Sequence, residues 1–541
     1  MATVDAKRPL KQRLTPLWRL PAIRDFSAPG WFDRLPAWLA TGGVLTALMA
    51  VSAFIRTREI GGQFWSDEAN TVGIASHPLS AIPGILRVGG GAPLYYVLLH
   101  LWMGVFGSSE TAVHSLSLVI ALINIPLAMW AGWSLFGRRA GYMAATLVAF
   151  NAFLTTFAGE GRMYELVAML GLACTASFLH AFVFGRYGYA WLFAGSLALM
   201  LYAEPWCLLF AAGCAAALVA CYFRAADPRA VLRYGAASMG LVLLAFVPWL
   251  PTLIHQASSA TAPWHYAPML GANFPRSLFG TDRVDAIFAI AVTAGCVPLL
   301  ARQRRGGKDA TAVLSLIVVT AASALLALLS SVFVPAWTVR YLAPLIAPLL
   351  LLVAFACARS GIVGLAVVLI SCAFLANAAS FVPKYKSDMK DVSGELAPRL
   401  TPGDLVLVGQ PEQAPLAWYY LPGGLRIATA LGPDQHPSYM NWDNAYSRLS
   451  QTNPAKLVTA LVSRLPAGQH LLYIRPLTEG EQAWSPAWAT LVRRRSAQIA
   501  EQLARTPSLV PVLGAWAPHN YRGSCCVASS ALLFVKRFPI R

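Results

Sequence analysis

Long apolar segments follow one another from residue 37 to residue 381 of this 541-residue chain. A helix needs about 20 predominantly apolar residues to cross a bilayer, and it satisfies its own backbone hydrogen bonds there. Only 12% of the residues are charged, against about 25% in soluble proteins. The sequence therefore predicts a polytopic α-helical membrane protein with about 11 transmembrane helices. These segments are 37–55, 111–136, 140–157, 163–184, 189–203, 206–223, 235–253, 284–301, 310–333, 341–358 and 361–381.

The charged residues between these segments predict the orientation of the chain. The formal net charge of +18 could indicate nucleic acid, but the basic residues fall in short connections on one side. That distribution is the positive-inside pattern, so we expect a cytosolic basic tail at 1–36, a multi-pass location in the plasma membrane and no nucleic-acid partner. The basic connections contain Arg138 and Arg139, Arg186, Arg224 to Arg233, Arg302 to Lys308, and Arg359.

The composition changes after about residue 383, where charged residues, proline and glycine become frequent. Strand-like and helix-like pieces alternate in this region, which is typical of a small α/β domain. We expect a transmembrane domain at 37–382 and an extracytoplasmic α/β domain at 383–541. The strand-like pieces are 405–408, 471–474 and 531–535, and the helical ones are 454–464 and 486–504.

The first extracytoplasmic connection, 57–110, is long for a polytopic protein and begins with Asp67 and Glu68. Adjacent carboxylates near lipid can act as a general base, a cation ligand or an anchor for substrate hydroxyls. They can equally be the solvated start of a loop. The apolar piece 92–107 opens with Pro93 and predicts a membrane-surface or re-entrant helix.

Three other clusters are expected on the same face. Glu160, Arg162 and Tyr164 either form a helix-connecting ion pair with an interfacial tyrosine, or join Asp67 in a cleft in which Arg162 binds an anion. Arg340 can grip a lipid phosphate through its planar guanidinium, or it can snorkel. His265, in the aromatic loop 254–283, is a weaker substrate-binding candidate, and Glu204 is of similar strength.

Taken together, these motifs are similar in order and spacing to those of the GT-C glycosyltransferases, in the branch that contains protein O-mannosyltransferases and the lipid A aminoarabinose transferase. One departure is His114, at a position where relatives often have arginine. The resemblance covers about residues 60–350. It is carried by Trp65 to Ala69, Ala92 to Tyr96, Leu99 to Trp102, Gly107 to Glu110, Glu160 to Tyr164, and Arg340 to Pro344.

The resemblance implies a GT-C-type membrane fold and transfer of a sugar from a polyprenyl phosphate to an acceptor hydroxyl outside the cytosol, with inversion. Mannose or arabinose is favoured as the sugar, and the acceptor is a glycan, a lipid or a protein. Asp67 would act as general base, and Arg340 and Arg162 would stabilise the leaving phosphate.

The resemblance also assigns supporting roles. Glu68 and Glu160 would position hydroxyls or hold a divalent cation with Asp67, so a metal is possible although no cofactor is certain. Further substrate contacts are expected from Tyr95, Tyr96, Tyr164 and Tyr341.

Two other classes of protein stay open at this stage. A lipid-sugar transporter or flippase would place polar residues near the bilayer midplane and often shows inverted repeats. A non-catalytic scaffold of the cell envelope would tolerate loss of Asp67 and Glu160 together. The chain contains no Walker loop, HExxH motif or zinc-spaced Cys/His cluster, which argues against a soluble nucleotide donor site.

Overall fold

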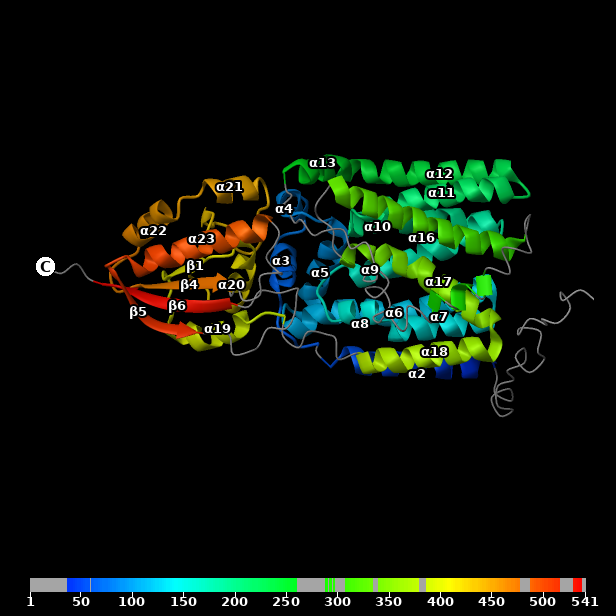
Figure 1. Ribbon diagram of the computed structural model, residues 1–541, viewed down its shortest axis with the longest axis horizontal. Helices are drawn as coiled ribbons and strands as arrows, with labels where there is room; N and C mark the ends of the chain where they lie inside the picture. The colour runs from blue at the N-terminus through cyan, green and yellow to red at the C-terminus, as the bar shows by residue number, and fades with distance from the viewer. Residues whose placement is uncertain are drawn as a thin grey trace, which may run out of the picture.

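The computed structural model is mostly helical, with a helical bundle at one end and a sheet domain at the other (Figure 1). Seven described helices are long and apolar enough to span a membrane, or eight if one bent pair counts as a single span. The predicted multi-pass membrane fold is therefore confirmed. The structure describes residues 37–58, 60–259, 288–289, 291–293, 295–296, 307–333, 339–378, 386–476, 487–515 and 529–537.

Ten of the eleven predicted segments coincide with described helices of the bundle, while most of 284–301 lies outside the described residues. The count of eleven spans therefore stays a prediction. The bundle helices are α2 (Ala37–Arg56), α6 (Glu110–Phe136), α7 (Arg138–Phe150), α8 (Ala152–Ala158), α9 (Tyr164–Phe178), α10 (Ala190–Ala203), α11 (Cys207–Arg224), α12 (Pro228–Phe246), α13 (Leu250–Ser259), α16 (Lys308–Phe333), α17 (Ala343–Arg359) and α18 (Gly361–Ala378).

The segment 140–157, expected as one continuous helix, is broken at Asn151. Asn151 has extended backbone angles, and its side chain accepts a hydrogen bond from the amide of Leu154 and so caps α8. Asparagine favours such caps because its short polar side chain replaces a missing backbone acceptor. The two helices, α7 and α8, meet at 52°.

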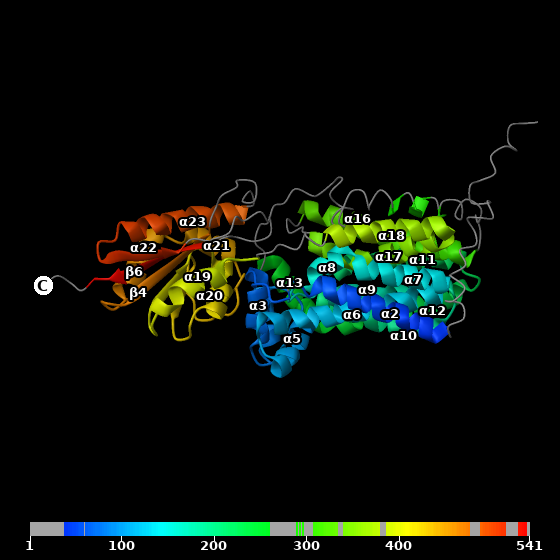
Figure 2. The ribbon, with the colours of Figure 1, turned by 90° about the horizontal axis from the view of Figure 1, so that it is seen from below.

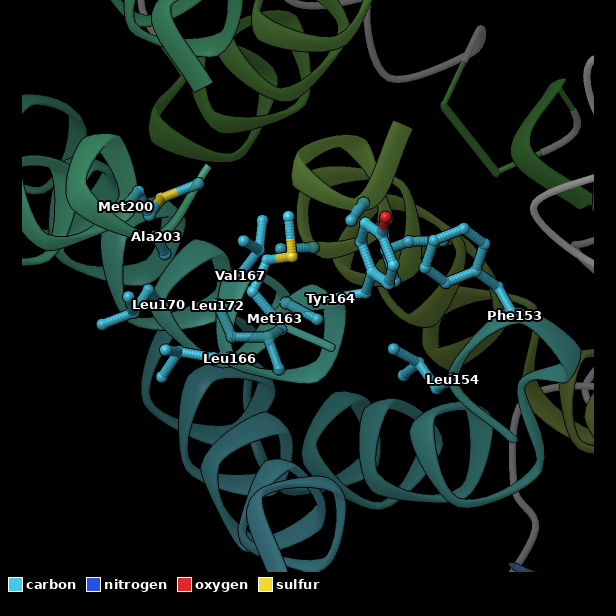
Figure 3. Close-up of a cluster of buried hydrophobic side chains, with 14 of the residues drawn as sticks. Phe153, Leu154, Met163, Tyr164, Leu166, Val167, Leu170, Leu172, Met200 and Ala203 are labelled. Atoms are coloured by element: carbon cyan, nitrogen blue, oxygen red, sulfur yellow. The ribbon is translucent and has the colours of Figure 1, made fainter. Parts of the chain in front are cut away.

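Apolar side chains of α8, α9 and α10 pack together in one buried cluster. Figure 3 shows Phe153, Leu154, Tyr164, Val167 and Met200 as members of this cluster, and Tyr164 is itself fully buried. This packing fixes the N-terminal end of α9, which follows Glu160 and Arg162, in a close-packed environment.

The connection 57–110 folds into three short helices, α3 (Ser66–Ala75), α4 (Ile82–Gly89) and α5 (Pro93–Phe106). α5 has 14 residues, too few to cross a bilayer of about 30 Å at 1.5 Å per residue. Figure 2 shows α3 and α5 at the end of the bundle nearest the sheet domain. A short helix at 92–107 is therefore confirmed, and its depth in the membrane stays a prediction.

The sheet domain contains six strands in the order β3-β2-β1-β4-β6-β5. β1 pairs in parallel with β2 and β4, whereas β6 is antiparallel to both β4 and β5. The three predicted strands are β1, β4 and β6, and the sequence analysis did not find the others. The strands are β1 (Leu405–Val408), β2 (Arg426–Thr429), β3 (Gly432–Pro433), β4 (His470–Pro476), β5 (Leu509–Ala515) and β6 (Ser529–Lys536).

Helices cover both faces of this sheet, because alternate strand residues point to opposite sides. Val406 and Leu472 belong to one cluster of buried apolar residues together with α19 and α20, and this cluster continues into the bundle. Leu407 and Tyr473 belong to a second cluster with α22 and α23. The helices of the domain are α19 (Met389–Leu396), α20 (Ala414–Tyr420), α21 (Ala445–Gln451), α22 (Pro454–Ser463) and α23 (Ala487–Ala504).

Candidate active site between the helical bundle and the sheet domain

Helix α3, which carries Asp67 and Glu68, lies between the bundle and the sheet domain (Figure 1). Just before the helix, the amide of Phe64 donates to the hydroxyl of Tyr420 at 2.8 Å. Along the helix, the side chain of Asn70 accepts from the amide of Met440 at 2.8 Å. The sheet domain therefore fixes α3 from the side opposite the bundle.

Gly73 marks the closest approach of α3 to the sheet domain. A Cβ atom at this position would lie 1.6 Å from the carbonyl oxygen of Ser438. The same Ser438 pairs through its hydroxyl with Nε2 of His77 at 3.0 Å. Since any larger residue at position 73 would clash with backbone, the glycine permits this docking.

Asp67 faces two arginines from different parts of the chain. Its Oδ2 lies 3.1 Å from Nη1 of Arg340 and 3.9 Å from Nη2 of Arg162. The Asp67 side chain keeps 32% of its surface exposed, so a substrate can reach it. Predicted residues from α3, from the turn before α9 and from the turn before α17 therefore converge here.

Aromatic rings and a threonine orient the two guanidinium groups. Nη1 of Arg162 donates to Oγ1 of Thr71 at 3.0 Å, one turn along α3 from Asp67. The Arg340 guanidinium lies over the Trp65 ring at 5.1 Å, and that of Arg162 lies 5.8 Å from the Tyr164 ring centre. Such cation–π contacts use the face of a guanidinium, and its N–H groups point outward along the edge, where they can donate to an anion.

Glu68, although adjacent to Asp67 in sequence, is fully buried. Its Oε1 contacts His114 Nε2 at 2.8 Å, Lys386 Nζ at 2.9 Å and the Gly161 amide at 2.9 Å. Oε2 accepts from the amide of Trp65 at 3.2 Å, at the start of α3. Burial opposes the charge, but the Lys386 ammonium and His114 outweigh it and lower the pKa of Glu68 to about 2.

Glu68 was expected at the site beside Asp67, to position hydroxyls or to hold a cation, but its side chain points elsewhere. Successive helical residues point about 100° apart, so when Asp67 faces the arginines, Glu68 faces the bundle. Its carboxylate is saturated with protein partners and has no exposed surface. The structure brings Glu68 to the site as a buried support.

Two further carboxyl groups, those of Glu160 and Glu204, interact electrostatically with Arg162 and Arg340. Burial raises the pKa of Glu160 to about 7, although Lys386 and both arginines oppose it. Burial likewise raises the pKa of Glu204 to about 7, against Arg162 and Arg340. One carboxylate oxygen of each is buried without a hydrogen-bond partner among the described residues. Both can therefore accept or share a proton with a bound polar group.

The tyrosines of α5 do not reach open space. Tyr95 and Tyr96 are 1% and 3% exposed. The Tyr95 hydroxyl pairs with Oγ of Ser117 at 2.9 Å. The Ser117 hydroxyl in turn donates to the carbonyl of Arg162. In this structure Tyr95 supports the turn that carries Arg162 through Ser117, and neither tyrosine has the exposed surface that a direct substrate contact needs.

An apolar crevice lies next to Arg340. Tyr341 stacks on Trp206, with ring centres 4.9 Å apart and an interplanar angle of 18°. The crevice is narrow, with about 10 Å³ of space for a water-sized group between α11, α16 and α17. Its walls are Trp206, Leu209, Phe210, Ser323, Ala327, Tyr341, Leu342, Pro344 and Leu345.

The predicted metal role finds no support in the geometry. Within the described part of the chain, no group of three or more His, Cys, Asp or Glu side chains could hold a metal ion. Asp67 contacts arginines, and no contact joins it to Glu160 among the described residues. His265 lies outside the described residues.

Sequence reasoning missed one residue and undervalued two. Lys386 carried no signal, because a single lysine in a polar stretch resembles a solvated residue. His114 was noticed only as a departure from relatives, and Glu204 only as a weak candidate. For Glu204 the available signal was an acidic residue between two apolar segments, where burial is costly.

Comparisons with known proteins identify the fold. No protein-family model and no curated protein matches the sequence. Solved structures do match. ArnT from Cupriavidus metallidurans bound to undecaprenyl phosphate has a TM-score of 0.57 at 14% identity, over 91% of this chain and 98% of that one. Archaeal oligosaccharyltransferase AglB from Archaeoglobus fulgidus, in complex with an inhibitory peptide and a dolichol-phosphate, has a TM-score of 0.53 at 10% identity, over 82% and 70%.

A third match is the arabinofuranosyltransferase AftD from Mycobacteria, with a TM-score of 0.51 at 15% identity. This match covers 91% of this chain and 40% of the AftD chain. All three are GT-C glycosyltransferases, and the match to ArnT extends over almost the whole of both chains. The predicted fold is therefore confirmed: this chain has the GT-C membrane fold with a C-terminal sheet domain.

Proposed function

We propose that this protein is a membrane glycosyltransferase that transfers a sugar from a polyprenyl-phosphate donor to an acceptor hydroxyl outside the cytosol. The observation that carries the proposal is the position of Asp67. Its partly exposed carboxylate faces Arg162 and Arg340, beside the apolar crevice at Tyr341. A phosphate on a long apolar chain would match this combination of cations and apolar walls.

The donor would bind by its phosphate and its lipid. Arg340 and Arg162 would take the phosphate through planar, bidentate hydrogen bonds, and the first part of the lipid would lie along the stacked rings of Trp206 and Tyr341. Two of the solved structures of the same fold contain undecaprenyl phosphate or dolichol-phosphate. This supports a polyprenyl-phosphate donor here.

In the transfer step, the acceptor oxygen would attack the anomeric carbon from the face opposite the phosphate. The bond from this carbon to the phosphate oxygen breaks, the configuration inverts, and Asp67 takes the acceptor proton. The phosphate leaves with its electron pair, and the two guanidinium groups stabilise its charge. When the donor phosphate engages the arginines, Asp67 loses part of their attraction and becomes available as a base.

A carboxyl group beside this centre would bind the sugar. Glu160 keeps part of its surface exposed and has one oxygen without a partner among the described residues, which suits a hydrogen bond with a sugar hydroxyl. Glu204 is only 3% exposed and would support the site from behind. Mannose and arabinose are the favoured sugars, and the acceptor is a glycan, a lipid or a protein of the cell envelope. We place the active site and the proposed domain 383–541 on the extracytoplasmic side of the plasma membrane, from the positive-inside pattern.

The test is transfer of radiolabelled sugar from a panel of polyprenyl-phosphate donors by the full chain in membranes. We expect one donor to deliver label into an acceptor with the wild type and not with Asp67→Asn. If Asp67→Asn transferred sugar at the wild-type rate, Asp67 would not be the general base. Absence of transfer from every donor, with intact protein, would favour a lipid-sugar transporter or a scaffold.

A further inference from the structure

We infer that Lys386, in the segment that joins the bundle to the sheet domain, is a positioning residue of the active site and acts on Asp67 through Glu68. This inference rests on the proposed function and deepens it. It makes the sheet domain a part of the catalytic unit, since the position of Lys386 is fixed by the fold that follows it.

Lys386 makes two buried contacts with the helix ends that carry the site. Its Nζ lies 2.9 Å from Oε1 of Glu68 and donates to the carbonyl of Gly159 at 2.7 Å. The Lys386 side chain is 8% exposed and that of Glu68 is fully buried. One ammonium group therefore ties α3 to the turn between α8 and α9, which also carries Arg162.

The segment after Lys386 is anchored at the same junction. The Asp391 carboxylate accepts from Nε2 of Gln63 at 2.8 Å, three residues before Ser66 begins α3. Ser393 Oγ donates to the carbonyl of Tyr420 at 2.6 Å, and the Tyr420 hydroxyl in turn accepts from the Phe64 amide. These contacts hold the Lys386 segment, α20 and the start of α3 as one unit.

The physical reason for a positioning effect is charge compensation in a dry site. A buried carboxylate that loses its cation must move toward water or take up a proton, and breaking a buried pair from one side is strongly destabilising. Glu68 precedes Ala69 and follows Asp67 on a single turn of α3, so a rotation of Glu68 toward water would turn Asp67 away from Arg340. A misplacement of about 1 Å in a catalytic group can lower a rate by about 100-fold.

Removal of both charges should do less harm than removal of one. In the double variant Glu68→Gln with Lys386→Met, the carboxylate that Lys386 contacts directly carries no charge, and the glutamine oxygen can still accept from the Gly161 amide. The matched control is Lys390→Met, in the same segment, because Lys390 is 51% exposed and pairs with Glu110 at the surface.

The experiment measures kcat, KM for the donor and apparent Tm on purified full-length protein. We expect Lys386→Met to lower kcat roughly 10- to 100-fold with less than about a threefold change in KM. Lys386→Arg should restore most of kcat, and Lys390→Met should match the wild type. The double variant should be more active and more stable than Lys386→Met alone, because the two effects are coupled.

Two results would overturn the inference. One is a kcat for Lys386→Met equal to that of Lys390→Met. The other is that the losses measured in the single variants Glu68→Gln and Lys386→Met simply multiply in the double variant. If the wild type transfers no sugar, the proposed function fails separately. The same five variants, with Glu68→Gln among them, are then compared by apparent Tm and by the thermal shift that added undecaprenyl phosphate causes. Additive effects on both quantities would show that Lys386 does not act through Glu68.

Discussion

Glu68 and Lys386 are 318 positions apart in the chain, yet the Lys386 ammonium lies 2.9 Å from the buried Glu68 carboxylate. One residue opens the first helix after the first span, and the other precedes the sheet domain. Their pairing means that the candidate active site is assembled by both parts of the chain. Predictions about the site therefore concern catalysis and the docking of the domain together.

The first prediction concerns Asp67. We expect Asp67→Asn to lower the rate of sugar transfer by roughly 100- to 10,000-fold, because asparagine cannot take up the acceptor proton. The measurement is the initial rate per amount of monodisperse protein. Asp309→Asn, which removes an exposed ion pair with Arg359 at the far end of the bundle, is the control and should keep the wild-type rate. Retention of more than about a tenth of the rate by Asp67→Asn would contradict the general-base role.

The second prediction concerns Arg340. Arg340→Ala should lower kcat/KM for the donor by roughly 10- to 100-fold, since a hydrogen bond to a charged group contributes about 1.5–3 kcal/mol. Arg340→Lys should recover only part of this, because an ammonium lacks the planar fork that matches phosphate. Arg359→Ala serves as the control, since this arginine is about half exposed and lies far from Asp67. A donor KM and kcat unchanged in Arg340→Ala would rule out the phosphate contact.

The third prediction concerns the pH dependence of stability. The pKa of Glu204 is raised from 4.5 to about 7 by burial, so between these values the folded state holds a proton that the unfolded state has lost. The free energy of unfolding therefore falls as the pH rises from about 4.5 to about 7. Glutamine does not titrate. Between about pH 4.5 and about pH 7, the apparent Tm of Glu204→Gln should therefore fall less than that of the wild type.

The control for this measurement is Glu501→Gln, on α23, whose side chain is 54% exposed. We expect its apparent Tm to follow the wild type at every pH. A Glu204→Gln curve parallel to the wild type would show that Glu204 is ionised throughout and that its burial is compensated.

The fourth prediction concerns the contact between α3 and the sheet domain. Gly73→Ala should lower both apparent Tm and transfer, because the new Cβ would lie 1.6 Å from the Ser438 carbonyl oxygen and would push the domain away from α3. Gly84→Ala, in α4, is the matched control, since a Cβ there meets nothing within 4 Å. That change should be neutral or stabilising by about 0.5–1 kcal/mol. Equal behaviour of the two variants would mean that this docking is not needed.

Much of the fold could be predicted because its signals are local. A run of apolar residues identifies a membrane helix wherever it occurs, and ten of the predicted segments are described helices. The same holds for strands β1, β4 and β6, which are short buried runs. The sequence analysis missed β2, β3 and β5, because they contain Gly, Pro or few apolar residues and depend on their neighbours in the sheet.

The candidate site was predictable only in part. Asp67, Arg162 and Arg340 each stood out as charged residues at the ends of apolar segments, where a charge is costly, and the structure brings these three together. The roles of Asp67 and Glu68 could not be separated in the sequence, because adjacent carboxylates look alike until the orientation of the helix is known.

The sequence by itself determined that the chain forms a bundle of membrane helices followed by a small α/β domain. It also placed the unusual charges at the ends of the apolar segments. Both follow from hydrophobicity and charge, which each segment carries independently of the rest of the chain. Only the tertiary structure decided that Glu68 points inward to Lys386 while Asp67 faces Arg162 and Arg340. The reason is that the partner of a charge depends on which distant segments pack together and on how α3 is rotated between them.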